Sequence, residues 1–283
     1  MKVAVCGAGG MLATDVIEVF RQKGHEVIGL SIDDMDITRI QAVLEKLQAV
    51  RPDIIFNAAA FTNVDGCESE PDLAYKVNAI GPRNLAIAAE GLDAALIHIS
   101  TDYIFGGAGN KPYREYDQVN PRSVYGKSKL DGEIMVRSHC SRHYIVRTAW
   151  LFGMHGNNFV RTMLRLAGER ELLSVVNDQL GSPTYTRDLA QATALLIEKP
   201  AYGTYHITNG DACTWFEFTR EILRQAGLEH VKVEPTTTEQ LKRPADRPRY
   251  SVLDNYMWRL EGYAPLRPYY EALQEYLQLE KNP

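Results

Sequence analysis

The 283-residue sequence lacks several features that mark specialised classes of protein. It has no apolar run of about 18 residues, so we expect no membrane-spanning helix. Its start, MKVAVCGAGG, enters a strand-like run directly and lacks the layout of a secretory signal. Basic residues are not in excess, because 31 Lys and Arg stand against 36 Asp and Glu. The net charge of −5 disfavours a nucleic-acid partner, and we expect a soluble protein that binds neither membrane nor nucleic acid.

The sequence is also poor in cysteine and in linker-like segments. The four cysteines are Cys6, Cys67, Cys140 and Cys213. None forms a C-x-x-C pair, which indicates reduced thiols and a cytoplasmic protein. The cluster HCSRH (139–143) has no further ligands around it, so we predict a turn there and no metal site. No repeat, Ser/Gly linker or low-complexity tract divides the chain.

What is present is an alternation of strands and helices in the first half. Strand-like apolar runs cover residues 2–7, 25–31, 53–60, 94–101 and 143–153. Helical periodicity covers residues 11–23, 37–50, 72–90 and 123–138. Such alternation is typical of a parallel sheet covered on both faces. We therefore predict an α/β, doubly wound (Rossmann) domain in residues 1–150.

The second half is less regular. Helical patterns cover residues 157–169, 185–198, 214–226 and 269–280, with strand-like pieces at LLSVV and GTYHIT. Trp215, Phe216 and Phe218 follow a candidate cap, Thr214, and we expect them to pack in a core. We predict that 151–283 form mainly a smaller α/β substrate-binding lobe, with parts of 174–208 returning to the Rossmann domain.

A glycine-rich segment, GAGGMLA (7–13), lies between the first predicted strand and helix. In its G-x-x-G-x-x-A pattern, Gly7 permits a tight turn, Gly10 lets a pyrophosphate approach, and Ala13 permits close packing. Backbone amides and the helix dipole would bind the phosphates. The position of the segment favours dinucleotide binding over an ordinary strand-to-helix turn.

The segment VYGKSKLDGE (124–133) fits two chemistries. Gly126-Lys127-Ser128 matches the end of a P-loop, but the first glycine of that motif would fall on Pro121, so we reject it. Tyr125 and Lys129 would lie one turn apart on the same helix face. The ammonium would lower the pKa of the phenol, and Tyr125 would then transfer a proton to a carbonyl oxygen. A solvent-exposed Tyr and Lys would show the same spacing.

The fourth predicted strand ends in Ser100-Thr101-Asp102, at the edge where open α/β sheets bind ligands. The Thr101 hydroxyl would hydrogen-bond the same carbonyl oxygen that Tyr125 protonates. Ser, Thr and Asp are also frequent in strand-ending turns.

Several motifs, in order and spacing, resemble those of the extended short-chain dehydrogenase/reductases. They are Gly7-x-x-Gly10, Asn57-Ala58-Ala59-Ala60, Val77-Asn78-Ala79, Ser100-Thr101-Asp102 and Tyr125-x-x-x-Lys129. Within this family the chain is similar to the reductases that form dTDP-L-rhamnose from a dTDP-4-keto-6-deoxy sugar. The matching segments are ISTDYIFGG, NPRSVYGKSKLDGE, IVRTAWLFG, GNNFVRTML, NDQLGSPTYTRDLA and GTYHITN. The resemblance runs essentially from Lys2 to the C-terminal helix.

The resemblance implies a role for individual residues. Catalysis would use Thr101, Tyr125 as general acid, and Lys129, which would also hold the nicotinamide ribose. Tyr125 and Lys129 would also bind the cofactor. The other cofactor-binding residues would be Gly7, Gly9, Gly10, Met11, Leu12, Ser31, Asp36, Ile37, Ala58, Ala59, Ala60 and Asn78. The dTDP-sugar would contact Thr101, Asp102, Tyr103, Trp150, Asn158, Phe159, Gln179 and Ser182.

The implied reaction is reduction of the 4-keto group of dTDP-4-dehydro-6-deoxy-L-mannose by NADPH or NADH. Strand two ends in Ser31-Ile32, where an acidic residue would bind the ribose of NAD or a basic one the phosphate of NADP. Asp33-Asp34 would disfavour a 2′-phosphate, so the choice between NADP(H) and NAD(H) stays open. Some members of the subgroup use magnesium, but no ligand set in this sequence supports it. We expect a homodimer, although no sequence feature defines an interface.

Other functions stay open. Thr101, Tyr125 and Lys129 do not distinguish this subgroup from other nucleotide-sugar reductases or 4-epimerases, although the substrate-side motifs resemble the reductase. Related 4,6-dehydratases carry Glu where this chain has Tyr103, so dehydration lacks its base. A non-catalytic, NADP-binding regulatory subunit also resembles the subgroup, but intact catalytic residues favour an enzyme.

One further segment, RPADRPRYS (243–251), is rich in arginine and proline. Two interpretations of this segment stay open. It is either a solvent-exposed surface, or it binds the substrate diphosphate through Arg247 and Arg249.

Overall fold

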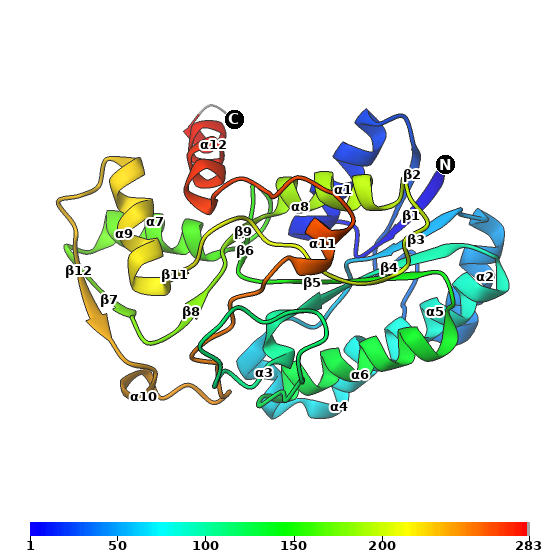
Figure 1. The fold of residues 1–283 in the computed structure, drawn as a ribbon, viewed down its shortest axis with the longest axis horizontal. Helices are drawn as coiled ribbons and strands as arrows, with labels where there is room; N and C mark the ends of the chain where they lie inside the picture. The colour runs from blue at the N-terminus through cyan, green and yellow to red at the C-terminus, as the bar shows by residue number, and fades with distance from the viewer. Residues whose placement is uncertain (282–283) are drawn as a thin grey trace.

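The computed structural model describes residues 1–281 and contains a six-stranded parallel sheet with a second lobe beside it (Figure 1). The strands are β1 (Lys2–Cys6), β2 (Glu26–Leu30), β3 (Ile54–Asn57), β4 (Ala95–Thr101), β5 (His143–Thr148) and β10 (Gly203–His206). Their order is β10-β5-β4-β3-β1-β2, and every neighbouring pair is parallel. The direction of winding reverses between β1 and β3. Open α/β sheets bind ligands at the carboxyl ends of the strands at such a point.

Alternating residues of the strands fill two cores, one on each face of the sheet. Val3 and Val5 pack with helices α1 (Met11–Gln22) and α8 (Thr186–Leu196). Ala4 and Cys6 pack on the other face, with α2 (Ile40–Val50), α5 (Gly81–Gly91) and α6 (Val124–His139). Two apolar faces explain why these strands read as continuous hydrophobic runs. The predicted doubly wound parallel sheet is confirmed.

The predicted helix at residues 72–90 is a series of shorter elements. After α3 (Val64–Ser69), α4 (Pro71–Tyr75) leads through the π-helix η1 (Lys76–Ile80) into α5. Asn78 lies inside the π-helix and is fully buried. Its side chain binds the backbone N and O of Phe61 at 2.8 and 3.1 Å and the Ser128 hydroxyl at 3.1 Å. The π-turn thus ties the loop after β3 to α6.

The predicted strand at residues 143–153 is interrupted, and this expectation was wrong. β5 ends at Thr148, and β6 (Leu151–Phe152) pairs instead with β9 (Thr184–Tyr185). Between them Trp150 has a φ of 47°, which a continuous strand does not permit. The chain therefore turns at the edge of the sheet and enters the second lobe.

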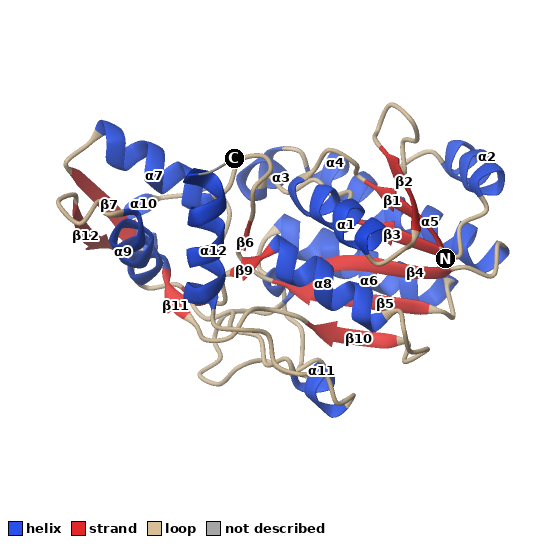
Figure 2. Ribbon diagram, turned by 90° about the horizontal axis from the view of Figure 1, so that it is seen from above, coloured by secondary structure: helices blue, strands red, loops and turns tan. Residues whose placement is uncertain are grey.

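The second lobe is built around an aromatic core. Its helices are α7 (Phe159–Glu169), α9 (Trp215–Ala226), α10 (Thr238–Leu241) and α12 (Tyr269–Lys281). Its other strands are β7 (Leu172–Val176) parallel to β12 (Lys232–Thr236), and β8 (Leu180–Gly181) antiparallel to β11 (Cys213–Thr214). Phe152, Tyr185, Phe218 and Tyr276 form the centre of this core. Figure 2 shows β5 and β10 pointing toward this lobe, so the carboxyl edge of the sheet faces it.

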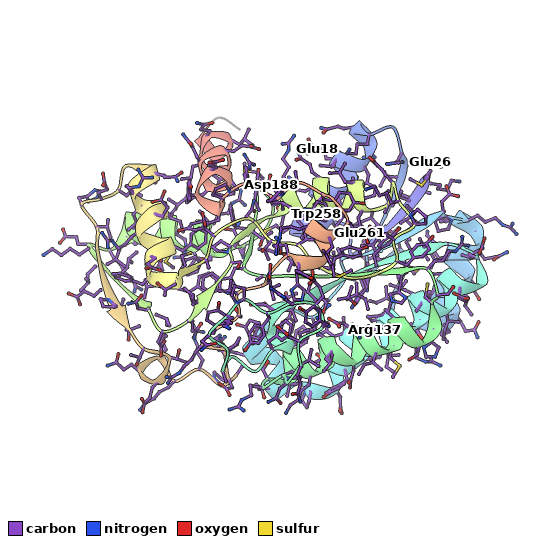
Figure 3. The ribbon with its side chains drawn as sticks, in the orientation of Figure 1. Glu18, Glu26, Arg137, Asp188, Trp258 and Glu261 are labelled. Atoms are coloured by element: carbon purple, nitrogen blue, oxygen red, sulfur yellow. The ribbon has the colours of Figure 1, made fainter. Side chains whose placement is uncertain are left out.

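The chain crosses between the two lobes more than once. Segment 174–208 contains α8 and β10, which pack on the sheet, and α11 (Tyr256–Leu260) places Trp258 in the same core. Asp188 of α8, labelled in Figure 3, accepts two hydrogen bonds from Arg267 at 2.8 and 2.7 Å. Arg267 also contacts Glu275 of α12 at 2.7 Å. This ion-pair cluster joins the C-terminal helix to α8, which packs on the sheet. A domain boundary at residue 150 stays a prediction.

Within residues 1–281, no helix has both the length and the apolar character needed to cross a membrane. The four cysteines are buried and free.

Candidate active site

A cleft of about 560 Å³ lies at the carboxyl edge of the sheet, and small-molecule sites commonly have this size. It is called the sheet-edge cleft below. The predicted residues that line it are Gly9, Gly10, Met11, Leu12, Ala58, Ala60, Thr101, Asp102, Tyr103, Tyr125, Lys129 and Trp150. The lining residues that the sequence did not single out for a site include Thr62, Val64, Thr148, Gly156, Asn157 and Trp215. The structure therefore brings the glycine loop and the predicted catalytic residues to one cavity.

The glycine loop has the backbone that a bound phosphate requires. Gly7 and Gly9 have φ values of 84° and 91°. A side chain on Gly7 would meet the backbone of Ala59 at 2.8 Å, whereas the space in front of Gly9 is open. Gly10 precedes α1 and offers no side chain to cap the helix. The first amides of α1 therefore face the cleft without a competing side chain, which fits the pyrophosphate of a dinucleotide.

Tyr125 and Thr101 meet at the bottom of the cleft. Ser123 caps α6 by accepting a hydrogen bond from the Gly126 amide at 3.1 Å, so Tyr125 stands in the first turn. Thr101 is the last residue of β4, and its hydroxyl hydrogen-bonds the Tyr125 phenol. Tyr103 packs edge-on against Tyr125, with ring centroids 5.6 Å apart. A proton donor and a hydroxyl thus converge on one point, where a substrate carbonyl would bind.

Lys129 lies one turn further along α6 and is 2% exposed. Its Nζ donates a hydrogen bond to the Ile99 carbonyl at 2.6 Å. Burial lowers its pKa to about 8, an effect that the Glu133 carboxylate opposes. Burial raises the pKa of Tyr125, and the hydrogen bond with Thr101 opposes that rise. The prediction that Lys129 lowers this pKa toward neutrality is therefore wrong here, because desolvation of the phenol dominates.

Two buried oxygens on the cleft have unused hydrogen-bonding capacity. Burial raises the pKa of Asp102 to about 6, although Thr101 donates a hydrogen bond to its Oδ1 at 3.0 Å. Thr148 Oγ1 finds no hydrogen-bond partner among the described residues, and the Asp102 carboxylate, which also hydrogen-bonds Ser251, can accept a further bond. Thr148 pairs with Thr101 across β4 and β5, so both strand ends present a hydroxyl at this edge. Buried polar groups of this kind are costly unless a ligand or water binds them.

A pair of stacked indoles forms the wall on the side of the second lobe. The rings of Trp150 and Trp215 are 3.4 Å apart and inclined by 4°. Trp215 Nε1 donates to Gln179 Oε1 at 3.1 Å, and Gln179 Nε2 donates to Thr238 at 2.9 Å. Gln179 therefore orients the wall without lining the cleft itself. The core role predicted for Trp215 was incomplete, since its indole both packs on the second lobe and faces the cleft.

Other predicted cofactor residues lie outside the lining of the cleft. Ser31 stands after β2, where its hydroxyl and amide donate to Asp34 Oδ2 at 2.7 and 2.9 Å. Asp36 accepts hydrogen bonds from Thr38, and Ile37 is buried against α5. Ala59 lies behind Gly7, and Asn78 binds Phe61 as described above.

The remaining predicted substrate contacts belong to the second lobe and its loops. Asn158 caps α7 and donates to the Gly153 carbonyl at 2.8 Å. Phe159 packs against Trp215, with ring centroids 4.3 Å apart. Ser182 is buried beside a separate cavity of about 360 Å³. The structure does not bring these side chains into the sheet-edge cleft.

Arg247 has a partner within the protein. Its guanidinium binds both oxygens of Asp65 at 2.9 Å, and it lies beside Tyr103. Arg249 is exposed, and its carbonyl accepts a hydrogen bond from the Leu180 amide. In this structure Arg247 fastens the loop at 243–251 to α3, and binding of the substrate diphosphate by Arg247 or Arg249 stays a prediction.

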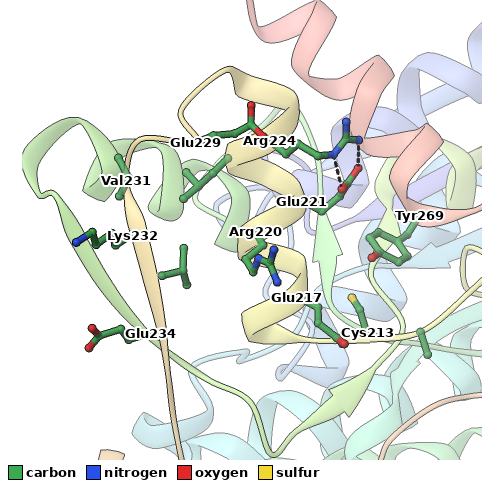
Figure 4. Close-up of a pocket in the computed structure, with 13 residues that line it drawn as sticks. Cys213, Glu217, Arg220, Glu221, Arg224, Glu229, Val231, Lys232, Glu234 and Tyr269 are labelled. Carbon is green, nitrogen blue, oxygen red and sulfur yellow. Dashed lines mark hydrogen bonds and ion pairs between the residues drawn. The ribbon is translucent and has the colours of Figure 1, made fainter.

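A second and larger cavity of about 760 Å³ lies on the second lobe, between α9 and β12 (Figure 4). It is called the lobe groove below. Charged side chains dominate its lining, and Arg224 pairs with Glu221 at 2.6 Å. None of the residues predicted for the site lines it.

No group of three or more side chains in residues 1–281 is arranged to hold a metal ion. In the segment HCSRH, His139 Nδ1 lies 2.9 Å from the Met135 carbonyl, and His143 Nδ1 lies 2.6 Å from the Cys140 carbonyl.

The fold and the cleft together define a class, that of nucleotide-binding α/β proteins with a Tyr–Lys pair at the sheet edge. The family model described as RmlD substrate binding domain matches residues 1–282, and the chain belongs to this family. The chain is 45% identical over 278 residues to a dTDP-4-dehydrorhamnose reductase of Streptomyces griseus, covering 96% of this chain and 91% of that protein. These matches confirm the family predicted from the motifs.

Two solved structures are similar over nearly their whole length. A dTDP-4-dehydrorhamnose reductase from Clostridium acetobutylicum has a TM-score of 0.97 and 46% identity, covering 99% of this chain and 100% of that one. One from Bacillus anthracis in complex with NADP has a TM-score of 0.96 and 42% identity, covering 98% of each chain.

Proposed function

We propose that this protein is an NAD(P)H-dependent dTDP-4-dehydrorhamnose reductase. It reduces the 4-keto group of dTDP-4-dehydro-6-deoxy-L-mannose and releases dTDP-L-rhamnose. One observation carries the proposal. The glycine loop, which offers no side chain to cap α1, lines the same cleft as Thr101, Tyr125 and Lys129. The names of the similar proteins support both the reaction and the sugar nucleotide.

The cofactor, when bound, supplies the hydride. Tyr125 donates the phenolic proton to the oxygen of the keto group, and its raised pKa keeps that proton in place before reaction. The Thr101 hydroxyl turns its one proton from Asp102 Oδ1 to the same keto oxygen and aligns it. Lys129 holds a cofactor ribose and places a positive charge near the developing oxyanion. Trp150 closes the sugar side of the cleft.

The cofactor is NADPH, with NADH accepted as a second donor. The NADP complex of the Bacillus anthracis protein supports NADPH as the cofactor, and this chain is 42% identical to that protein. The neighbourhood of Ser31 has no strong preference for a 2′-phosphate, because Ser31 binds the Asp34 carboxylate. Asp34 would lie close to such a phosphate and weaken its binding.

Two observations separate this proposal from a dehydratase and from a regulatory subunit, whereas the epimerase is left to the experiment. Tyr103 packs on Tyr125 where a dehydratase would need a carboxylate, so elimination of water has no base there. A purely regulatory subunit would not need a buried Lys129 with a lowered pKa beside a protonated Tyr125. A homodimer, a cytoplasmic location and the roles of individual residues stay predictions.

The proposal is tested with purified protein, freshly prepared dTDP-4-keto-6-deoxy sugar, and NADPH or NADH in parallel. Loss of nicotinamide absorbance, with dTDP-rhamnose identified by mass spectrometry and NMR, is the expected result. Release of an epimerised keto sugar without cofactor oxidation would favour the epimerase. Tight cofactor binding with no turnover of any dTDP-keto sugar would favour the regulatory subunit.

A further inference from the structure

Beneath the cleft, α6 carries a third polar side chain on the face that holds Tyr125 and Lys129. Glu133 follows Lys129 by four residues, as Lys129 follows Tyr125, so the three lie one above the other. The first two line the cleft, whereas Glu133 is 0% exposed. A fully buried carboxylate is unusual and requires partners.

Four hydrogen bonds satisfy the Glu133 carboxylate. Arg147 of β5 donates from Nε to Oε1 at 2.9 Å and from Nη2 to Oε2 at 2.8 Å. Arg137, labelled on α6 in Figure 3, donates to Oε2 at 2.7 Å, and Ser100 of β4 donates to Oε1 at 2.6 Å. One side chain thus joins α6 to β4 and β5 directly below the catalytic residues.

Two of the bonds between α6 and β4 determine where Thr101 stands. Lys129 binds the Ile99 carbonyl, and Glu133 binds the Ser100 hydroxyl. Ile99 and Ser100 are the two residues that precede Thr101. These bonds fix the end of β4 relative to the helix that carries Tyr125, and the distance between the two hydroxyls depends on them.

The charges around this cluster are unequal. Arg137 of α6 and Arg147 of β5 both bind the Glu133 carboxylate, and Lys129, one turn before Glu133 on α6, adds a third positive charge nearby. Burial raises the pKa of Glu133, but Arg147, Arg137 and the Ser100 hydrogen bond outweigh it and hold this pKa at about 2.

The two histidines that face the cluster add no charge. Burial lowers the pKa of His98 on β4 well below its usual range and lowers that of His206 on β10 to about 3. Glu115 contacts Arg147 through its backbone carbonyl, while its carboxylate binds the amides of His206 and Met257. The Glu133 carboxylate is therefore the anion that raises the pKa of the buried Lys129.

We propose that Glu133 is a positioning residue for the reduction, which keeps the Lys129 ammonium charged and holds Thr101 in register with Tyr125. This inference rests on the reductase function proposed above. It assigns Glu133 no contact with substrate or cofactor, because the side chain lies below the cleft and acts through Lys129 and Ser100.

The test is the pH dependence of kcat/KM for Glu133→Gln. The amide keeps the size of the side chain and removes its charge, so the pKa of Lys129 falls. The ammonium is then lost at lower pH, so the alkaline limb of the profile should shift to lower pH by about one pH unit. An unchanged alkaline limb, with activity lowered equally at every pH, would show a structural role alone and overturn the proposal.

Arg137→Met is the matched control, because it also removes a hydrogen bond from the Glu133 carboxylate but leaves the negative charge. Its alkaline limb should not move down. A downward shift equal to that of Glu133→Gln would assign the effect to lost contacts and contradict the proposal.

If Glu133→Gln does not fold, the double variant Glu133→Met with Arg147→Met replaces it. Apolar residues of similar volume commonly substitute for a buried ion pair without loss of the fold. A downward shift smaller than that of Glu133→Gln is expected, because loss of the Arg147 cation opposes it, and the absence of any shift counts against the proposal. A wild-type protein without turnover would refute the reductase function first, and the pH dependence of NADPH binding would then test Glu133 separately.

Discussion

The sheet-edge cleft and the lobe groove differ in how their polar groups are held. The groove is the larger of the two, at about 760 against 560 Å³. Its charges lie at the surface, and Arg224, with a side chain 59% exposed, pairs with Glu221. In the cleft, Lys129 and Asp102 are almost fully buried and have shifted pKa values.

This difference teaches that volume alone does not identify a site. Exposed ion pairs contribute little free energy and need no ligand. Buried groups with perturbed pKa values and unpaired oxygens are costly to hold, and they gather where a reaction uses them. If this is correct, substitutions in the cleft should affect turnover strongly, and substitutions in the groove should not.

Among substitutions that test this comparison, a large effect is expected for Lys129→Met. This substitution removes the ammonium beside the reaction point and the hydrogen bond to Ile99, so kcat/KM should fall about 10³-fold. Steady-state kinetics with NADPH measures the change. Lys127→Met, two residues earlier and exposed, is the control and should retain activity. Equal losses in both variants would mean that the helix surface, and not the buried ammonium, matters.

A smaller effect should follow from loss of the indole wall. Trp215→Leu removes the stacking partner of Trp150, and an aromatic pair of this kind contributes about 1 kcal/mol beyond its buried area. KM for the sugar nucleotide should rise about fivefold, with little change in NADPH affinity. Phe216→Leu, the next residue along α9, is the control. An unchanged KM for Trp215→Leu would remove Trp215 from the site.

The cofactor preference should respond to Asp34. Asp34→Asn removes an exposed negative charge from the end of β2, so kcat/KM with NADPH relative to NADH should rise about two- to fivefold. Added salt should reduce the gain. Glu26→Gln, at the opposite end of the same strand, should leave the ratio unchanged. A ratio that stays constant in Asp34→Asn would place the ribose phosphate elsewhere.

The smallest effect is expected in the lobe groove. Arg224→Ala breaks the pair with Glu221. The free energy of unfolding should stay within about 0.5 kcal/mol of the wild type and kcat/KM within about twofold. Kinetics and denaturant titration measure the two quantities. A large loss of turnover would show that the groove takes part in substrate binding and would break the comparison.

The sequence predicted the sheet well because parallel strands are apolar on both faces and their helices are amphipathic. It also predicted the helices α7, α8, α9 and α12 and the strands β7 and β10, but it missed β6, β8, β9 and β11, which have two residues each and show no periodicity. The sequence pattern did not predict β12, because this strand contains Pro235 and is mostly exposed. Trp150 interrupts the predicted fifth strand with a positive φ that no local pattern indicates.

For the site, spacing along a helix was enough to bring Tyr125 and Lys129 together. Residue spacing gives no information on the desolvation of the Tyr125 phenol, so the predicted direction of its pKa shift was wrong. Arg247 forms an ion pair with Asp65, which lies 182 residues earlier in the chain, and no local pattern predicts such a pair. The stacking of Trp215 on Trp150 likewise depends on how the second lobe closes over the sheet.

The most direct test of the central claim compares wild type with Tyr125→Phe, using NADPH and dTDP-4-keto-6-deoxy sugar. The substitution removes one hydroxyl and keeps the ring that packs against Tyr103. We predict that the variant binds NADPH as the wild type does but loses nearly all oxidation of it. A Tyr125→Phe variant that reduces the sugar at the wild-type rate would show that the sheet-edge cleft does not use this proton donor, and the account would be wrong.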